Sequence, residues 1–235
     1  MGKKDIKIYG DSISTCWRFQ KEGYEVYYNK ERAEYNQLKS ERDFWWWPVA
    51  EQLAMKDGSI AKIENHSYSG STVKGSEFPS GASDQRIRRM SNPYFECAFI
   101  LIYMGFNDFG HRVPVYPVPG EEDFYSAYVA MLRKMKELFP EAHILPATLL
   151  MTKSDVHPQW KFPEEERFKE YNKAISDAAA ACGCTLVDLT KARVPGMKSE
   201  VRLNTMDRYH SHPDVEGHDL LAYCWIDQLK KQHIL

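Results

Sequence analysis

The chain has 235 residues, of which 43% are hydrophobic and 27% are charged. This length and composition fit one α/β domain over 1–235, with a single large core. The 31 Lys and Arg residues nearly balance the 33 Asp and Glu residues, and a net charge of -2 provides no field that would gather nucleic acid. No apolar run reaches the roughly 18 residues that a membrane span needs. These values argue against a nucleic-acid-binding protein and against a membrane protein.

The cysteine count points to a reducing compartment. An odd number of cysteines in a chain of this size favours free thiols over a disulfide framework, and hence the cytoplasm. The amino end leads into an expected strand rather than the apolar core of an export signal, although a chain already trimmed of such a signal would look the same. The five residues are Cys16, Cys97, Cys182, Cys184 and Cys224.

Short apolar runs alternate with longer amphipathic stretches, which is typical of a parallel sheet with helices on both faces. Strands are expected over 6–9, 60–63, 98–103, 143–145 and 185–187. The third run is the most apolar and is expected at the centre of the sheet. Helices are expected over 43–56, 83–91, 121–138, 164–181 and 214–231. The predicted fold is a flavodoxin-like, three-layer α/β/α sandwich on five parallel strands.

One stretch, 17–42, does not fit this alternation and is expected to be a long inserted loop. It carries six aromatic residues among many charges and leaves from the carboxyl end of the first strand. Ligands bind beyond that edge in open α/β sheets, so the insertion can wall a binding site. The alternative is a surface flap that covers the helix beginning at Phe44. The tryptophans at 45–47 are expected to pack in the core rather than to form a ligand platform.

The first expected strand ends in Gly-Asp-Ser-Ile-Ser at 10–14, which places the hydroxyl of Ser12 in a sharp turn at the carboxyl edge of the sheet. The backbone N–H of Ser12 can also help to stabilise an oxyanion. Asp11 is expected to tie down the turn. Alone the motif is weak evidence, because Gly-Asp-Ser is also ordinary turn chemistry.

Two further loops follow expected strands and are expected to meet the Ser12 turn. The loop at 66–73 carries Gly70, and a Gly-Phe-Asn-Asp loop carries Asn107 and Asp108. The backbone amide of Gly70 and the side-chain amide of Asn107 are neutral donors that can point at a developing oxyanion. Each such donor is typically worth about 3–4 kcal/mol in the transition state. Asp108 is expected to hold its own loop.

A serine hydroxyl near its free pKa is a poor nucleophile and needs a general base. Histidines are dense near the carboxyl end, over 207–218. His212 precedes Pro213 and an expected helix start, so its ring is placed on a loop from which it can turn toward Ser12.

These four blocks, in this order and at these distances, resemble the SGNH (GDSL-type) hydrolase family over nearly the whole chain. The matching blocks are Gly-Asp-Ser-Ile-Ser at 10–14, Ser-Gly-Ser at 69–71, Gly-Phe-Asn-Asp at 105–108 and His-Pro-Asp-Val-Glu-Gly at 212–217. The resemblance implies that Ser12 attacks an acyl carbonyl and that His212 takes its proton. It also implies an oxyanion hole made by the amides of Ser12 and Gly70 and the side chain of Asn107.

The chain departs from the family at the acid that orients the histidine. The family usually has Asp three residues before the catalytic His, where this chain has Tyr209; Asp207 stands three residues before His210 instead. Two solutions are open. Either His212 is the base, oriented by Asp207 or by a backbone carbonyl in a dyad, or His210 is the base with Asp207 at the usual spacing. The interval from His212 to Gly217 favours the first.

Other candidate groups are interpreted as outside the chemistry. A second Asp-x-His-Pro sequence at 155–158 matches no catalytic block of the family. His66 is expected to make a local hydrogen bond. Cys182 and Cys184 lack the second pair of ligands that a zinc site would need, so no metal is expected.

The sequence therefore predicts an ester hydrolase that acts on short acyl esters through an acyl-serine intermediate, with no metal and no cofactor. The polar and aromatic insertion at 17–42, together with Trp160, favours O-acetylated carbohydrate over a long acyl chain. The alternative is a catalytically impaired carbohydrate-binding protein on the same fold. A nucleotide- or flavin-binding module is disfavoured because both glycine-rich phosphate-binding fingerprints are missing.

Overall fold

The computed structural model describes residues 2–19, 21–152, 164–197, 201–204 and 212–235. Its sheet has four strands in the order β2-β1-β3-β4, and every pair of neighbours is parallel. The strands are β1 (Lys4–Gly10), β2 (Ile60–Asn65), β3 (Glu96–Tyr103) and β4 (His143–Pro146). The first four expected strands are therefore confirmed, with the most apolar one in the interior of the sheet.

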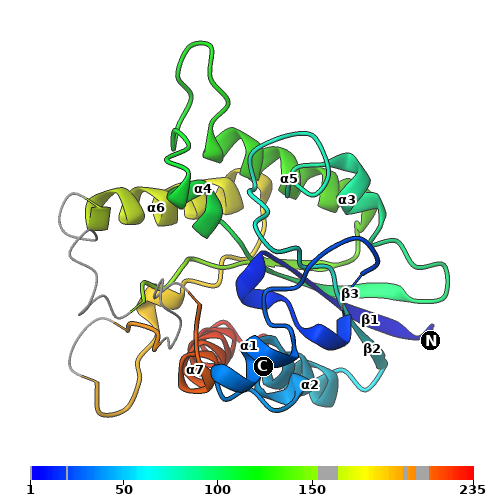
Figure 1. Ribbon diagram of the computed structural model, residues 1–235. Helices are drawn as coiled ribbons and strands as arrows, with labels where there is room; N and C mark the ends of the chain where they lie inside the picture. The colour runs from blue at the N-terminus through cyan, green and yellow to red at the C-terminus, as the bar shows by residue number, and fades with distance from the viewer. Residues whose placement is uncertain (1, 20, 153–163, 198–200, 205–211) are drawn as a thin grey trace.

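Helices cover both faces of the sheet, so the three layers are as predicted (Figure 1). One face carries α3 (Asp84–Arg88), α4 (Phe106–Gly110), α5 (Phe124–Leu138) and α6 (Glu164–Cys182). The other face carries α1 (Lys30–Tyr35), α2 (Trp46–Lys56) and α7 (Val215–Lys231). Helix α5 shows why these segments are helical: Asp123 caps it by accepting from the Ser126 N–H, and its buried positions recur every three or four residues.

The central strands are buried on both faces, which explains their continuous apolar sequence. Ile6 and Ile8 of β1 are fully buried, and so is most of β3. The exceptions in β1 are two buried charged residues, Asp5 and Lys7. The Lys7 ammonium lies 2.7 Å from the carboxylate of Asp5 and 2.9 Å from that of Glu64, so its charge is compensated.

The expected fifth strand at 185–187 is wrong. Val187 makes a single parallel bridge to Ala147, in which its N–H donates to the Pro146 carbonyl and its carbonyl accepts from the Thr148 N–H. The Leu186 carbonyl faces away from β4 and accepts from the side chain of Gln232 at 2.7 Å, so this outer side is bonded to a side chain. Toward the carboxyl end the chain turns at once into a 3₁₀ helix (Leu189–Lys191).

The insertion is also more ordered than a plain loop. Helix α1 lies within it, capped by Asn29, whose side chain accepts from the Arg32 N–H. Trp17 and Phe19 pack their rings on Phe44 and Trp46, at centroid distances of 5.7 and 5.4 Å. The insertion thus covers the start of α2, as one of the two sequence interpretations proposed, and it also reaches the candidate site.

Candidate active site

The Ser12 turn follows directly from the end of β1. A 3₁₀ turn spans Ser12–Ser14, and Asp11 caps it by accepting from the Ile13 N–H at 3.0 Å. The Ser12 carbonyl accepts from the Thr15 hydroxyl at 2.8 Å. A side chain at Gly10 would lie 2.7 Å from the Cβ of Ser14, so glycine is required for this tight exit from the strand. Asp11 ties down the turn, as predicted.

Two buried tryptophans donate hydrogen bonds to the same turn. The indole N–H of Trp45 donates to the Ser14 hydroxyl, and that of Trp46 donates to the Ser14 carbonyl, both at 3.1 Å. The side chain of Asn65, at the end of β2, donates to the same carbonyl at 2.7 Å. Trp45 and Trp46 are fully buried, so the expectation that they pack in the core is confirmed.

His212 lies beside Ser12 although 200 residues separate them in the chain. The Nε2 atom of His212 is 2.8 Å from the Ser12 hydroxyl oxygen. The histidine precedes helix α7, which Asp214 caps by accepting from the Gly217 N–H at 2.8 Å. A side chain at Gly217 would clash with the Asn204 carbonyl, so glycine allows the helix start to approach that segment. This explains in physical terms why a glycine follows His-Pro at this interval.

The second block joins the Ser12 turn through its backbone. The Tyr68 N–H donates to the Gly10 carbonyl at 3.1 Å. Gly70 has a φ of +73°, in the region that favours glycine, and its missing side chain would point into open space. The block therefore leaves room beside Gly70 for a bound molecule.

The third block is tied to the second by two side chains. The side-chain amide of Asn107 donates to the Ser71 carbonyl at 3.0 Å, and its second hydrogen can donate elsewhere. The carboxylate of Asp108 accepts from the N–H groups of Val73 and Lys74 at 2.7 and 2.9 Å. Asp108 thus holds the two loops together, which goes beyond the prediction that it holds its own.

Sequence reasoning missed Arg86, which links the first two blocks. This arginine of α3 is 1% exposed, and its guanidinium donates to the carbonyls of Gly10, His66 and Pro79 at 2.6, 3.1 and 2.7 Å. It also donates to the Ser71 hydroxyl at 3.0 Å. The sequence offers no signal that separates it from the exposed arginines two and three residues later.

Two further histidines are neutral, the fully buried His218 and the half-buried His66. Burial lowers the pKa of His218 to about 3, and its Nδ1 accepts from the Trp45 N–H at 3.3 Å, so Nε2 carries the proton. Burial likewise lowers the pKa of His66 to about 4, and its Nε2 lies 3.4 Å from the Glu64 carboxylate. His66 makes the local contact that the sequence predicted. Both histidines thus bond groups other than the Ser12 hydroxyl.

Some predicted residues cannot be placed. Asp207 and the alternative base His210 lie outside the described residues, and so do the second Asp-x-His-Pro sequence at 155–158 and Trp160. The structure therefore brings together Ser12 and His212 and links the loops of Gly70 and Asn107 to them, while the acid that orients His212 stays a prediction.

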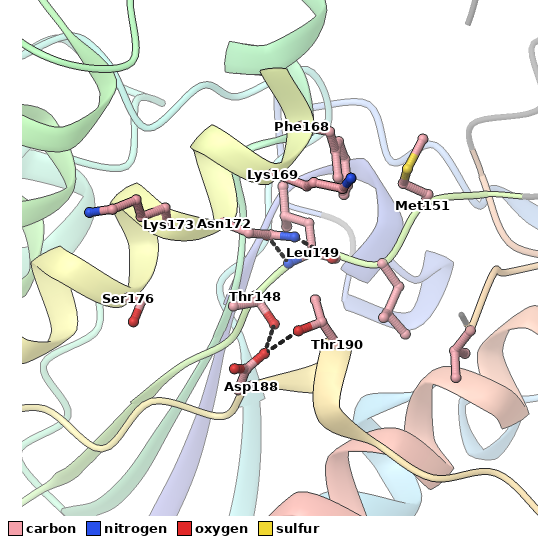
Figure 2. Close-up of a pocket in the computed structure, with 12 residues that line it drawn as sticks. Thr148, Leu149, Met151, Phe168, Lys169, Asn172, Lys173, Ser176, Asp188 and Thr190 are labelled. Atoms are coloured by element: carbon pink, nitrogen blue, oxygen red, sulfur yellow. Dashed lines mark hydrogen bonds between the residues drawn. The ribbon is translucent and has the colours of Figure 1, made fainter. Parts of the chain in front are cut away.

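A cavity of about 430 Å³ opens beyond β4, beside helix α6 (Figure 2). Several of its lining groups bond to one another. The side chain of Asn172 accepts from the Leu149 N–H at 2.7 Å and donates to the Leu149 carbonyl at 3.0 Å. The hydroxyls of Thr148 and Thr190 donate to Asp188 at 3.2 and 2.6 Å. The four residues of the predicted site do not line this cavity.

The buried carboxyl of Asp11 gives a test of the site's electrostatics. Burial raises its pKa to about 7, against the lowering effect of the Ile13 N–H and the Arg86 charge. An unfolded Asp has a pKa of about 3.9. The folded state therefore holds this proton more tightly, and the stabilisation, complete below about pH 4, is lost as the pH rises through about 7. Asp11→Asn removes this dependence and keeps an oxygen for the Ile13 N–H.

Between about pH 4 and 8 the wild type should lose stability that Asp11→Asn does not lose. We therefore expect the difference in unfolding free energy, Asp11→Asn minus wild type, to rise by a few kcal/mol over this range, on the order of 1.4 kcal/mol per unit of pKa shift. Urea unfolding at intervals of pH measures it. Asp84→Asn is the control, because Asp84 is exposed, bonds Lys134, and has its pKa lowered by that bond. A relative stability of Asp11→Asn that does not change with pH would contradict the assignment.

The fold and the linked blocks define a three-layer α/β/α protein with a serine and a histidine in contact at the carboxyl edge of its sheet. The sequence matches the GDSL-like Lipase/Acylhydrolase family over residues 8–220. The chain therefore belongs to this family, the SGNH hydrolases, whose members are carboxylic ester hydrolases.

Solved structures share the fold at low sequence identity. Est24, a carbohydrate acetylesterase from Sinorhizobium meliloti, is 15% identical with a TM-score of 0.64, over 98% of this chain and 100% of that one. A variant of Axe2, an acetyl xylan esterase from Geobacillus stearothermophilus, is 18% identical with a TM-score of 0.56, over 97% and 96%. A Bacteroides ovatus protein assigned as a GDSL-like lipase is 18% identical with a TM-score of 0.62, over 99% of each chain. No curated protein matched.

The described residues carry neither a membrane span nor a metal cluster. None of their helices combines the length and apolar character needed to cross a membrane. Within the same part of the chain, no three His, Cys, Asp or Glu side chains gather as a metal would require.

Proposed function

We propose that this chain hydrolyses short acyl esters through an acyl-Ser12 intermediate, with His212 as the general base. The observation that carries the proposal is the 2.8 Å separation between His212 Nε2 and the Ser12 hydroxyl oxygen. That distance is within the reach of direct proton transfer between a nucleophile and its base. The family match supports the same reaction class.

Acylation then proceeds by attack of the Ser12 oxygen on the ester carbonyl while His212 Nε2 takes the hydroxyl proton. Collapse of the tetrahedral intermediate breaks the bond to the leaving alcohol, and the imidazolium returns its proton to that alcohol. In deacylation His212 takes a proton from water while the water oxygen attacks the acyl-Ser12 carbonyl. Collapse of this second tetrahedral intermediate breaks the bond between the acyl carbon and the Ser12 oxygen, releases the carboxylic acid, and returns the proton from His212 to the Ser12 oxygen.

The oxyanion of each tetrahedral intermediate would be bound by three neutral donors. They are the backbone N–H groups of Ser12 and Gly70 and the second side-chain N–H of Asn107. Two observations support this arrangement: open space faces Gly70, and Asn107 has one of its two amide hydrogens engaged by Ser71. Donors that are fixed before the reaction need no reorganisation when the charge develops.

For the substrate we propose O-acetylated carbohydrate. Two features support this choice. The insertion brings polar and aromatic side chains to the site, which suits a sugar better than a long acyl chain. Two proteins with the same fold carry names of acetylesterases that act on carbohydrate or xylan.

The experiment measures kcat/KM on p-nitrophenyl esters from acetate to decanoate, together with acetate release from acetylated xylan. We expect the highest kcat/KM with acetate and a fall with every longer chain. A serine-directed fluorophosphonate should label the wild type once and leave Ser12→Ala unlabelled, as read from the intact mass.

Two results would overturn parts of the proposal. A kcat/KM that rises steadily toward decanoate would refute the short-acyl preference and leave the acyl-serine mechanism intact. A folded wild type that hydrolyses none of these esters and is not labelled, yet still binds acetylated xylan, would favour the carbohydrate-binding alternative.

A further inference from the structure

We propose that Tyr27 is a positioning residue for the reaction: its ring stacks on the imidazole of His212 and holds that imidazole in the plane that aims Nε2 at Ser12. The inference rests on the proposed function. Tyr27 belongs to the insertion rather than to any of the four blocks, so neither the motif nor the family match assigns it a role.

The two rings lie face to face. Their centroids are 3.4 Å apart and their planes differ by 7°. The proton and lone pair of an imidazole lie in the plane of its ring, so a partner on the face leaves both nitrogens accessible at the edge. Rotation of the imidazole about its bond to Cβ would drive its edge into the Tyr27 ring. Stacking therefore restricts a rotation that would swing Nε2 away from the Ser12 oxygen, 2.8 Å distant.

Tyr27 is itself fixed by backbone contacts to two of the blocks. Its N–H donates to the hydroxyl of Ser69 at 2.7 Å and to that of Thr15 at 3.2 Å. The Thr15 hydroxyl donates in turn to the Ser12 carbonyl at 2.8 Å. These bonds fix the backbone of Tyr27 relative to the turn that carries Ser12 and relative to Ser69, the residue before Gly70.

A second contact comes from helix α1. The guanidinium of Arg32 lies 5.0 Å from the centroid of the Tyr27 ring, and its Nη1 donates to the Tyr27 carbonyl at 3.4 Å. The Tyr27 ring is therefore contacted both by the His212 imidazole and by the Arg32 guanidinium, and α1 supplies the guanidinium.

The next residue secures the backbone of the histidine loop. The buried hydroxyl of Tyr28 donates to the Pro213 carbonyl at 2.7 Å. The ring of Tyr28 also meets the ring of His212 edge-on, with centroids 6.1 Å apart. Tyr28 thus bonds the backbone of the loop that carries His212, while Tyr27 stacks on the His212 ring. The insertion therefore positions both the backbone and the side chain of this histidine.

The test compares three variants. Tyr27→Leu removes the flat face and keeps an apolar side chain, Tyr27→Phe keeps the face, and Tyr35→Leu removes an exposed tyrosine of the same insertion as the control. On p-nitrophenyl acetate we expect Tyr27→Leu to lower kcat by about 10- to 100-fold with KM little changed, because misplacement of a reacting group by about 1 Å costs about this much. Tyr27→Phe should restore kcat to within about threefold, on the same argument about geometry.

A second readout does not depend on turnover. The Cε1 proton of His212, assigned by its loss in His212→Ala, should be displaced upfield by the Tyr27 ring current. The displacement should persist in Tyr27→Phe and disappear in Tyr27→Leu. This measurement also shows whether Tyr27→Leu is folded, from the remaining spectrum.

The outcomes separate the two proposals. An active wild type in which Tyr27→Leu retains full kcat would overturn the positioning role and leave the proposed function standing. A fall in kcat that Tyr27→Phe does not restore would overturn it as well, since the ring face would not be the cause. If the wild type hydrolyses no ester, the proposed function fails, and the absence of an upfield displacement would then refute the stacking itself.

Discussion

Replacing Ser12 by alanine is expected to lower kcat on p-nitrophenyl acetate by about four orders of magnitude or more, which is the loss seen when a triad member is removed from a serine hydrolase. The reason is geometric. His212 Nε2 contacts the Ser12 hydroxyl oxygen, and without that oxygen the proposed acyl-Ser12 intermediate cannot form. The Asp11 cap and the Trp45 and Trp46 bonds to Ser14 do not involve the Ser12 hydroxyl, so the variant should fold.

His212→Ala is expected to lose a similar factor, because nucleophile and base act as one unit. The variant lacking both groups should then be little slower than either single variant. His210→Ala should keep most of the activity under this assignment. A collapse of kcat in His210→Ala, with His212→Ala nearly unaffected, would move the base two residues toward the amino end and contradict the role given to the 2.8 Å contact.

Asp207→Ala distinguishes a triad from a dyad. An orienting carboxylate fixes the tautomer of the histidine, and its loss cost about four orders of magnitude in kcat in a well-studied serine protease. A comparable loss in Asp207→Ala would show that the unusual spacing still delivers a triad. A loss below about tenfold, small beside that reference, would leave His212 oriented by other groups, with Tyr27 among them. The measurement is the same chromogenic assay, with folding checked by circular dichroism.

The strand that the sequence indicated most clearly is β3, which is buried on both faces. Runs such as 98–103 are continuously apolar because the parallel sheet is covered by helices above and below. The run at 185–187 looks similar locally. It makes a single bridge to Ala147 and then turns into a 3₁₀ helix, and its Leu186 carbonyl bonds the side chain of Gln232, 46 residues away. Local pattern carries no information about such a distant partner.

The candidate site divides in the same way. Ser12 and His212 could be predicted from short motifs, because each needs a specific neighbourhood: a glycine that allows a tight strand exit, and a glycine that allows a helix start to approach another segment. Tyr27 and Arg86 carry no comparable signature. Each acts through a contact made only in three dimensions, one with a ring from the far end of the chain and one with backbone carbonyls of separate loops.

Arg86→Met is expected to destabilise the fold more than any of the other substitutions proposed above. The guanidinium is buried and donates to three main-chain carbonyls and one hydroxyl. Burial lowers the pKa of this guanidinium, while Tyr9 and Tyr68 act to raise it. The guanidinium lies 4.1 and 5.0 Å from the centroids of these two rings. Methionine fills a similar volume and supplies no donor. The carbonyls cannot be removed with it: those of His66 and Pro79 lose the Arg86 donor, and that of Gly10 keeps only the Tyr68 N–H.

Leaving a buried polar group unpaired costs about 1–3 kcal/mol. Two carbonyls and one hydroxyl lose the Arg86 donor and a third carbonyl loses one of its two donors, so we expect Arg86→Met to lose about 3–5 kcal/mol of unfolding free energy in urea. For a chain of this size that corresponds to a fall in Tm of very roughly 6–20 °C. Arg88→Met makes the same chemical change at an exposed position of α3 and should stay within about 0.5 kcal/mol of the wild type.

The position of Arg86 also links stability to the site. It bonds the Gly10 carbonyl, two residues before the nucleophile, and Ser71, whose carbonyl receives the Asn107 amide. Folded Arg86→Met, measured well below its Tm, should therefore show a reduced kcat on p-nitrophenyl acetate while Arg88→Met does not. If Arg86→Met were as stable as the Arg88→Met control, the three carbonyls would not need the arginine as a donor. The backbone bond from Tyr68 to Gly10 would then hold the block containing Ser12 to the block containing Gly70.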